Sequence, residues 1–434
     1  MRVDRSDPDA VLRRYYLFRA MAAVGFIAPV FALFVLRDLS YAAYGALSAL
    51  YSLLLVGGEV PTGYVADRLG RRDTLVASKV ALAASLFGFL AVDSFGSYLV
   101  VYVVWGVGMA LTSGTGSAWL YEVLESTVGG EEFTRVRGRG NAVARWSAAV
   151  TTILGSILYT ADPRYPFIAA GTLMLAGAGV VATLPRIEQF ETGAGGPEPR
   201  EAVALLRDRI ARPPLRSFVL FVALLFAIAG AGNQYIQPAA VAVADDVAIE
   251  GLPLVGGALD TVRGALGSVA VADVDATAAT GLGPLYASFA AVGAGLSYYA
   301  DRVERAVGLR GALVGVAAVL TVTFLAPLAV PVAAVAAFYA SQGVAHLLRP
   351  MVEAHVNDHT GDAGRATVLS AVSMVLGLAR TPFVVLAGLA AGAWGPVAAF
   401  GALAGLFVAL AVPLALLGSP FASGQSESGA AAAQ

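Results

Sequence analysis

The chain contains no cysteine and little charge. The absence of cysteine excludes disulfides, thiolate metal sites and cysteine nucleophiles together. Only 13% of the 434 residues are charged and 58% are apolar, a balance far from that of soluble globular domains. Most of the chain is therefore expected to lie in lipid, as a multi-pass protein of the cell membrane.

Several other functional classes lack the residues that they need. Lys79 is the only lysine, so no glycine-rich phosphate loop ending in lysine is present, which excludes ATP-driven pumping. A net charge of −2 argues against a nucleic-acid partner. His355 and His359 could share a metal if one helix held both, but residues 357–361 predict a turn. We expect no metal, no cofactor and no enzymatic activity.

Long apolar runs dominate what is present. Runs of about twenty residues predict helices, because every backbone polar group in lipid must be paired internally. The predicted fold class is all-α, with twelve transmembrane helices in two six-helix bundles. The expected spans of the first bundle are 12–36, 40–66, 73–93, 97–124, 137–160 and 164–185. Those of the second are 215–243, 282–300, 309–329, 331–357, 364–391 and 394–417.

The distribution of arginine predicts the orientation of these bundles, since cytoplasmic loops are enriched in Lys and Arg. A cytoplasmic N-terminus (1–11) precedes the first bundle (12–185), a cytoplasmic linker (186–214) leads to the second (215–417), and a disordered tail (418–434) follows. With the N-terminus inside, only Arg37, Arg164 and Arg263 lie outside. The inner side holds Arg2, Arg5, Arg68, Arg71, Arg72, Arg135, Arg186, Arg200, Arg207, Arg209, Arg212, Arg302 and Arg305. Both termini are therefore expected in the cytoplasm.

An outer insertion at 245–281 interrupts the second bundle. Its apolar residues recur at spacings of three and four, and Asp260 and Arg263 fall off that stripe. We interpret it as an amphipathic helix on the outer surface, with an additional span as the alternative.

A charged motif follows the second span and recurs after the eighth. The second copy holds Asp301 and Arg302, with Ser297 and Glu304 in place of two glycines. The first copy is complete and comprises Gly63, Asp67, Arg68, Gly70, Arg71 and Arg72. Duplicated halves of this kind are typical of transporters.

The motif has two interpretations. Asp67 either caps a neighbouring helix as part of a conformational latch, or only ends its own helix while the arginines bind lipid headgroups. Two copies, each closing the second helix of its half, favour the latch. Because the first copy is complete, the working latch is expected around Asp67, and the second copy is expected only to anchor the fold.

This arrangement resembles the major facilitator superfamily, in which the motif marks the loop after the second helix and recurs after the eighth. Residues 59–63 are similar to the Glu-Ile-Pro-Thr-Gly form of one branch, and residues 114–122, 235–238 and 365–370 share that branch's pattern. The resemblance implies two bundles that rock about a central cavity. Tyr102 stands where many proton-coupled members have arginine, which weakens the case for proton antiport.

Ionisable residues inside the spans are costly and are functional candidates by default. In the first half these are Arg19, Glu59, Glu122 and Arg145, which form either a static salt-bridge network or contacts that change with conformation. Glu59 shares a helix face with Gly63 and Asp67 and is the expected coupling acid.

The second half carries its own ionisable residues. Arg349 and Glu353 share a face with His346 on the tenth span. Arg380 lies near mid-membrane, where it either pairs with Glu353 or Glu59 or holds an anionic group of a substrate.

Polar side chains beside Pro238 are candidates for the substrate cavity, because the backbone groups that a proline frees can face such a cavity. They are Asn233, Gln234, Tyr235 and Gln237, with His346 on the tenth span. Simple hydrogen bonding between helices is the alternative.

Together these features predict a monomeric secondary transporter that moves a small organic molecule by alternating access. Efflux is expected from the branch resemblance, with protons or another ion as coupling partner and membrane lipids around the protein. Uptake of a small solute, or a non-transporting receptor with the same fold, is the alternative.

Overall fold

The computed structural model of the chain describes residues 8–21, 23–113, 115–127, 132–186, 213–250, 274–358 and 365–418. Within these ranges the protein is helical and contains no strand, as the hydropathy pattern predicts. Most of the N-terminus, most of the linker, the centre of the outer insertion and nearly all of the tail lie outside the described residues. The expectations for those segments stay predictions.

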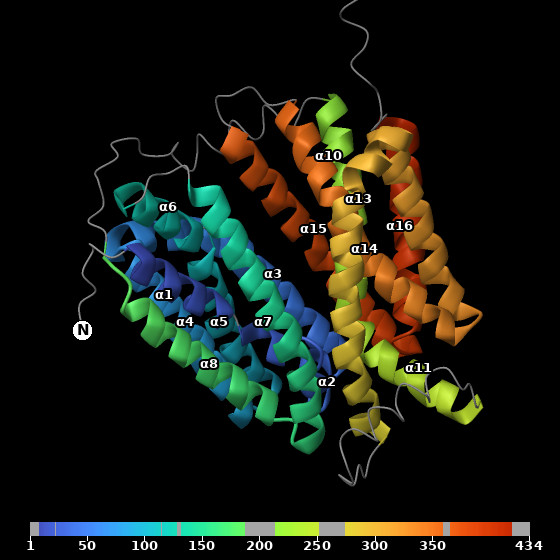
Figure 1. Cartoon of the computed structure of the whole chain (residues 1–434). Helices are drawn as coiled ribbons and strands as arrows, with labels where there is room; N and C mark the ends of the chain where they lie inside the picture. The colour runs from blue at the N-terminus through green and yellow to red at the C-terminus, as the bar shows by residue number, and fades with distance from the viewer. Residues whose placement is uncertain are drawn as a thin grey trace, which may run out of the picture.

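Two groups of helices, α1 to α8 and α10 to α16, lie on opposite sides of the molecule (Figure 1). The first group contains α1 (Pro8–Ala20), η1 (Ala23–Phe26), α2 (Phe31–Leu36), α3 (Tyr41–Leu69), α4 (Arg71–Gly88), η2 (Phe89–Ala91), α5 (Phe95–Thr112), α6 (Thr115–Thr127), α7 (Phe133–Ala161) and α8 (Tyr165–Ala182). The second contains α10 (Pro213–Gln234), α11 (Ile236–Glu250), α13 (Val274–Leu325), η4 (Ala326–Leu328), η5 (Pro331–Ala333), α14 (Ala334–Asp358), α15 (Arg365–Trp394) and α16 (Ala398–Gly418).

The two halves meet mainly along α3 with α15 and along α7 with α13. Gly45 and Gly388 face each other in the first of these contacts, where a Cβ on Gly45 would lie 3.4 Å from the Cα of Gly388. Small residues let helices in a membrane approach closely. Further along the same pair, Gly377 packs on Val56, so the two helices run antiparallel in a regular register.

Ten helices of the described chain are long and apolar enough to cross a membrane, whereas the sequence predicts twelve. One difference is at the first predicted span, 12–36, which is divided into α1, η1 and α2. The other is at 282–300 and 309–329, which form the single kinked element α13. Twelve spans and cytoplasmic termini stay predictions.

The break between α1 and α2 allows α7 to pack against it. Pro29 has no N–H to donate, which removes one helical hydrogen bond at this point. A side chain on Gly25 would clash with Thr151, and one on Gly155 would clash with the backbone of Phe26. The break is therefore a packing feature of the first half.

The second copy of the charged motif does not close its helix, contrary to the prediction. In the first copy Asp67 lies three residues before Gly70, where φ is 85° and α3 ends. In the second copy the helix continues through Asp301 to Gly308, where φ is 69° and ψ is 167°. Glutamate replaces glycine at 304, so the turn forms one helical turn later, about 6 Å further along the axis.

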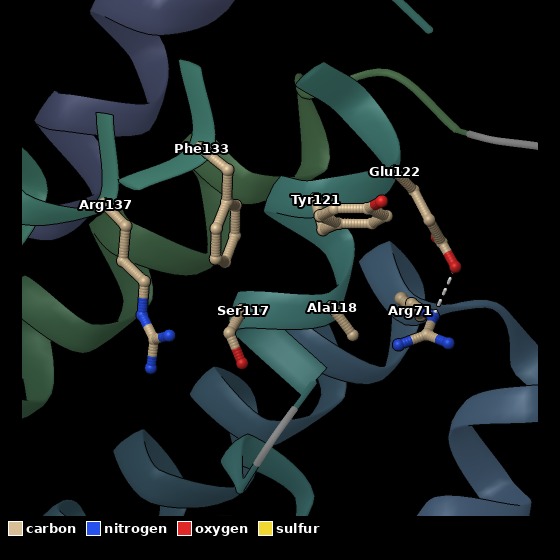
Figure 2. Close-up of a pocket in the computed structure, with 7 residues that line it drawn as sticks. All are labelled: Arg71, Ser117, Ala118, Tyr121, Glu122, Phe133 and Arg137. Atoms are coloured by element: carbon tan, nitrogen blue, oxygen red, sulfur yellow. Dashed lines mark ion pairs between the residues drawn. The ribbon is translucent and has the colours of Figure 1, made fainter. Parts of the chain in front are cut away.

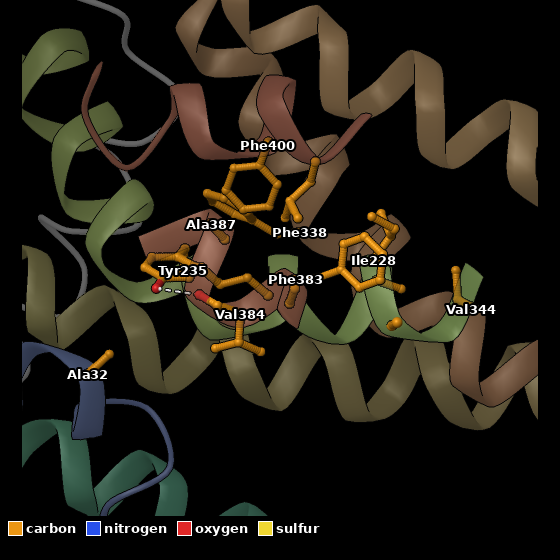
Figure 3. Close-up of a cluster of buried hydrophobic side chains, with 14 of the residues drawn as sticks. Ala32, Ile228, Tyr235, Phe338, Val344, Phe383, Val384, Ala387 and Phe400 are labelled. Carbon is orange, nitrogen blue, oxygen red and sulfur yellow. Dashed lines mark hydrogen bonds between the residues drawn. The ribbon is translucent and has the colours of Figure 1, made fainter. Parts of the chain in front are cut away.

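The core of the second half forms where α10, α14, α15 and α16 meet. Phe338 and Phe400 are buried in it with rings 5.7 Å apart, and Val384 and Ala387 of α15 pack beside them (Figure 3). Burial of such side chains stabilises a helix bundle mainly by close packing when the surroundings are lipid. This core holds α10 and α15 in the positions that the candidate site requires.

Gly308→Ala should destabilise the protein, because the backbone conformation at Gly308 is open to glycine and strained for alanine. We expect a loss of about 1–3 kcal/mol in the free energy of unfolding, seen as a lower unfolding temperature in detergent. Gly179→Ala in α8 is the matched control, since an added Cβ there meets nothing within 4 Å. Equal losses in the two variants would contradict the assigned turn.

Candidate functional site

Gln237 replaces a backbone hydrogen bond that the broken first helix leaves open. In a continuous helix the carbonyl of Ala28 would accept from the N–H of Ala32. Here the Ala32 N–H donates to Gln237 Oε1 at 2.7 Å, and Gln237 Nε2 donates to the Ala28 carbonyl at 2.7 Å. Gln237 Nε2 also donates to the Tyr286 hydroxyl at 3.1 Å. One amide thus joins the halves at what we call the closed end, formed by Ala28, Ala32, Gln237 and Tyr286.

A second amide, that of Gln234, connects α3 to α15. Arg380 Nη2 donates to Gln234 Oε1 at 2.7 Å. Gln234 Nε2 in turn donates to Ser48 Oγ at 2.9 Å and to the Tyr44 hydroxyl. Tyr44 and Ser48 are one turn apart on α3 of the first half, so the polar chain runs from one half to the other. These side chains and their neighbours form the central polar cluster, which comprises Tyr44, Ser48, Tyr51, Gln234, Tyr235 and Arg380.

Arg380 makes no ion pair with any carboxylate of the described residues. Its Nε is buried without a hydrogen-bond partner. The predicted pairing with Glu353 does not form, since Glu353 lies 4.0 Å from Arg349 on its own helix. The side chain of Glu59 lies outside the described residues.

Aromatic side chains surround the central polar cluster. Tyr235 is buried, and its hydroxyl donates to the Val384 carbonyl at 3.3 Å (Figure 3). Tyr51, three residues beyond Ser48 on α3, lies 5.8 Å from Trp105 between ring centroids. Phe31 lies 4.7 Å from Trp105. Phe31, Tyr51 and Trp105 are each only half-buried, so part of this aromatic surface is accessible.

The first copy of the motif is exposed at the end of the molecule opposite the closed end. We call this the motif end. Asp67 and Arg68 of α3 are both exposed, and the Arg68 guanidinium lies 4.4 Å from the centre of the Tyr64 ring. Gly63 has open space around its Cα. Arg72 donates to the Ala182 carbonyl, which ties the loop to α8.

An ion pair between Arg71 and Glu122 joins α4 to α6 at 2.7 Å. Figure 2 shows this pair at one side of a pocket of about 310 Å³. Residues of α6 and α7 complete the pocket, namely Ser117, Ala118, Tyr121, Phe133 and Arg137. Glu122, which the sequence groups with Arg19 and Arg145, is instead bound by a motif arginine.

The other predicted charges of the first half do not gather into one network among the described side chains. Arg19 donates to the Gly140 carbonyl at 3.3 Å and to Asn141 Oδ1 at 2.7 Å, both on α7. Arg145, also on α7, is exposed. Arg19 is therefore held by two neutral oxygen acceptors and not by an acid.

In the second half the predicted residues lie along two helices. Asp301 pairs with Arg305 at 2.7 Å within α13, and Arg302 lies 5.1 Å from the centre of the Tyr299 ring. His346 of α14 packs against Gly293 of α13. The helix continues to Asp358 and so overlaps the start of the predicted turn at 357–361, while His359 lies outside the described residues. No group of three metal-ligating side chains occurs within the described chain.

The residues of α3 that complete the central polar cluster were not predicted from the sequence. Tyr44, Ser48 and Tyr51 recur at spacings of four and three, which places them on one helical face. Polar residues with this spacing in an apolar span were the available signal. Asn233, by contrast, was predicted, and its Oδ1 is buried without a partner.

Comparison with known proteins supports the family resemblance. A family model described as Major Facilitator Superfamily matches residues 16–259, more than half of the chain. The chain belongs to the major facilitator superfamily. As a member of it, the protein is a multi-pass membrane protein and not an enzyme.

Individual superfamily members are only distantly similar. The Uncharacterized MFS-type transporter YxaM of Bacillus subtilis (strain 168) is 20% identical over 202 residues, covering 45% of this chain and 49% of that protein. The match thus spans about half the length of this curated relative. The structure of the nucleoside transporter NupG has a TM-score of 0.68 at 14% identity, covering 94% of this chain and 98% of that chain. A bacterial homologue of the human lysosomal transporter Spinster has a TM-score of 0.65 at 16% identity, covering 95% and 96%.

Gln237→Leu should weaken the closed end, because it leaves the Ala28 carbonyl and the Ala32 N–H buried without partners. Each buried group that loses its partner costs about 1–3 kcal/mol, so a clear fall in unfolding temperature is expected. Asn233→Leu is the matched control, since its Oδ1 already has no partner. Thermal unfolding in detergent compares them, and an equal or larger loss in Asn233→Leu would refute the bridging role.

Proposed function

We propose that the protein is a secondary active transporter that moves a small organic molecule across the membrane by alternating access. The observation that carries this proposal is the pair of amides that bond the two halves, Gln237 at the closed end and Gln234 in the central polar cluster. At the other end the charged motif residues Asp67 and Arg68 are exposed. Two halves that are bonded at one end and free to separate at the other can expose a central site to one side at a time.

In the proposed orientation the motif end faces the cytoplasm and the closed end faces outward. The arginine bias of the sequence supports this assignment, because the short loops at the motif end contain most of the loop arginines. In that orientation the exposed motif residues Asp67 and Arg68 face the cytoplasm. The superfamily membership supports transport as the activity.

The latch is proposed to form in the opposite conformation, between α3 and α15. These helices are antiparallel, with Gly45 beside Gly388 and Val56 beside Gly377. Continuing that register residue by residue places Asp67 level with the first turn of α15, which begins at Arg365. A carboxylate there would accept hydrogen bonds from the free N–H groups of the helix and oppose its positive end.

The direction of transport is proposed as efflux, with uptake of a small solute as the second candidate. Asn233, Gln234, Tyr235, Gln237 and His346 are the proposed cavity residues, and Glu59 is the proposed coupling acid. The protein is proposed to act as a monomer with lipid around it. Purified protein in proteoliposomes tests the activity directly. Binding of a solute without any flux would instead favour a receptor.

The absence of cysteine allows a direct test of the orientation. Two variants each place one thiol at an exposed position. Asp93→Cys lies between η2 and α5, and Ala306→Cys lies next to the bend of α13 at the motif end. In intact cells a membrane-impermeant maleimide should label Asp93→Cys, while Ala306→Cys should be labelled only after permeabilisation. The reverse pattern would invert the proposed topology.

Asp67→Asn should reduce transport by at least about tenfold while the protein still folds and inserts. A neutral amide interacts with the positive end of a helix more weakly than a carboxylate does, by on the order of 1 kcal/mol or more. Flux in proteoliposomes and the unfolding temperature are the two measurements. Asp93→Asn, at the other end of the molecule, is the matched control and should transport normally. Normal flux in Asp67→Asn would refute the latch hypothesis.

A further inference from the structure

We propose that Arg380 binds the carboxylate of an organic acid, and that the apolar body of this acid lies against Tyr51 and Trp105. The inference rests on the proposed transport function and adds the class of substrate. It also assigns a role to Arg380, for which the sequence allowed either a structural ion pair or binding of an anionic group of the substrate.

The first step is the unbalanced charge of Arg380. A guanidinium presents five N–H donors and stays charged under physiological conditions. Within the described chain one donor, Nη2, meets the neutral Gln234 amide, and the buried Nε meets no acceptor. An isolated charge in the interior is costly unless it is paired. The site therefore favours an anion that the described side chains do not supply.

The second step concerns Glu59, the nearest acid along α3. The register of α3 and α15 places Arg380 level with Leu53, six residues from Glu59. Six helical residues separate the two levels by about 9 Å along the axis. The guanidinium is bound to Gln234, whose partners Tyr44 and Ser48 lie on the other side of Leu53 from Glu59. Arg380 is thus directed away from Glu59.

The third step is the geometry that holds the guanidinium. Gln234 fixes one nitrogen without neutralising it, and Gln234 is itself fixed by Tyr44 and Ser48. Such a preorganised arginine suits a planar carboxylate, which can accept two parallel N–H bonds. A doubly charged phosphate would call for a second cation, and the side chains bonded to Gln234 beside Arg380 are the neutral Tyr44 and Ser48.

The fourth step is the surface beside the charge. Tyr51 and Trp105 are half-buried and in ring contact, and Phe31 continues the aromatic surface on the far side of Trp105. Ligand sites generally combine an apolar wall with a few fixed polar groups. One cation next to an aromatic wall matches an acid with an aromatic or other apolar body.

The test compares matched acids and amides on purified protein in detergent. The probes are benzoate, 1-naphthoate and indole-3-acetate, each paired with its neutral amide. Binding to the folded state raises the unfolding temperature. We expect at least one acid to stabilise the protein while its amide does not, and Arg380→Gln to weaken that acid's binding at least about tenfold. Arg380→Lys should retain part of the affinity, and the exposed Arg164→Gln should bind as the unaltered protein does.

Three results would overturn the proposal: no stabilisation by any acid, equal stabilisation by an acid and its amide, or full affinity in Arg380→Gln. If Arg380→Gln fails to fold, the acid–amide comparison and the Arg380→Lys variant still test whether Arg380 binds a carboxylate. Trp105→Phe gives an independent readout, because the bound acid should quench the fluorescence of Trp105 and this quenching should disappear, whereas the exposed Trp394 can be replaced without effect. Acid binding that depends on Arg380 but comes without flux would refute transport and keep the site. Flux of neutral solutes only would support transport and refute the proposed acid site.

Discussion

The structure depends on one constraint of the membrane interior, that every backbone polar group must find a partner within the protein. The first half breaks its first helix between Ala28 and Ala32, and the second half breaks between α10 and α11. Gln237, placed just after the second break, supplies both the donor and the acceptor that the first break lacks. Each irregularity would be costly in lipid alone, and together they form the contact that holds the halves at the closed end.

The two halves share a pattern but not a geometry at the motif end. The first copy closes α3 at Gly70, whereas the second copy lies inside α13, which turns only at Gly308. As a result Asp301 is satisfied by Arg305 on its own helix, while Asp67 is exposed. A duplicated sequence has therefore become one candidate latch and one internal ion pair, which favours a mechanism controlled from the first half.

The few charges within the described helices are balanced in different ways. Arg71 has a carboxylate, Glu122, and Arg19 has the amide groups of α7. Arg380 also has a neutral partner, the amide of Gln234, but this contact lies at the junction of the halves. The cation is thus held in place without being neutralised, close to the contacts that would break in the proposed rocking of the halves. An anion bound there would couple substrate occupancy to the same contacts.

The sequence by itself determined that the chain lies in a membrane, that its fold is all-α and that the charged motif occurs twice. Hydropathy and an arginine-rich motif are properties of local residue order. It also pointed to Gln234, Gln237 and Arg380 as polar residues in apolar spans. Only the tertiary structure decided their partners. Gln237 meets Ala28 and Ala32, and Arg380 meets Gln234, across distances of more than a hundred residues. The turn at Gly308 and the pairing of Glu122 with Arg71 likewise depended on how helices pack. Periodicity shows which face of a helix is polar, but the partner of that face is set by packing between helices far apart in the chain.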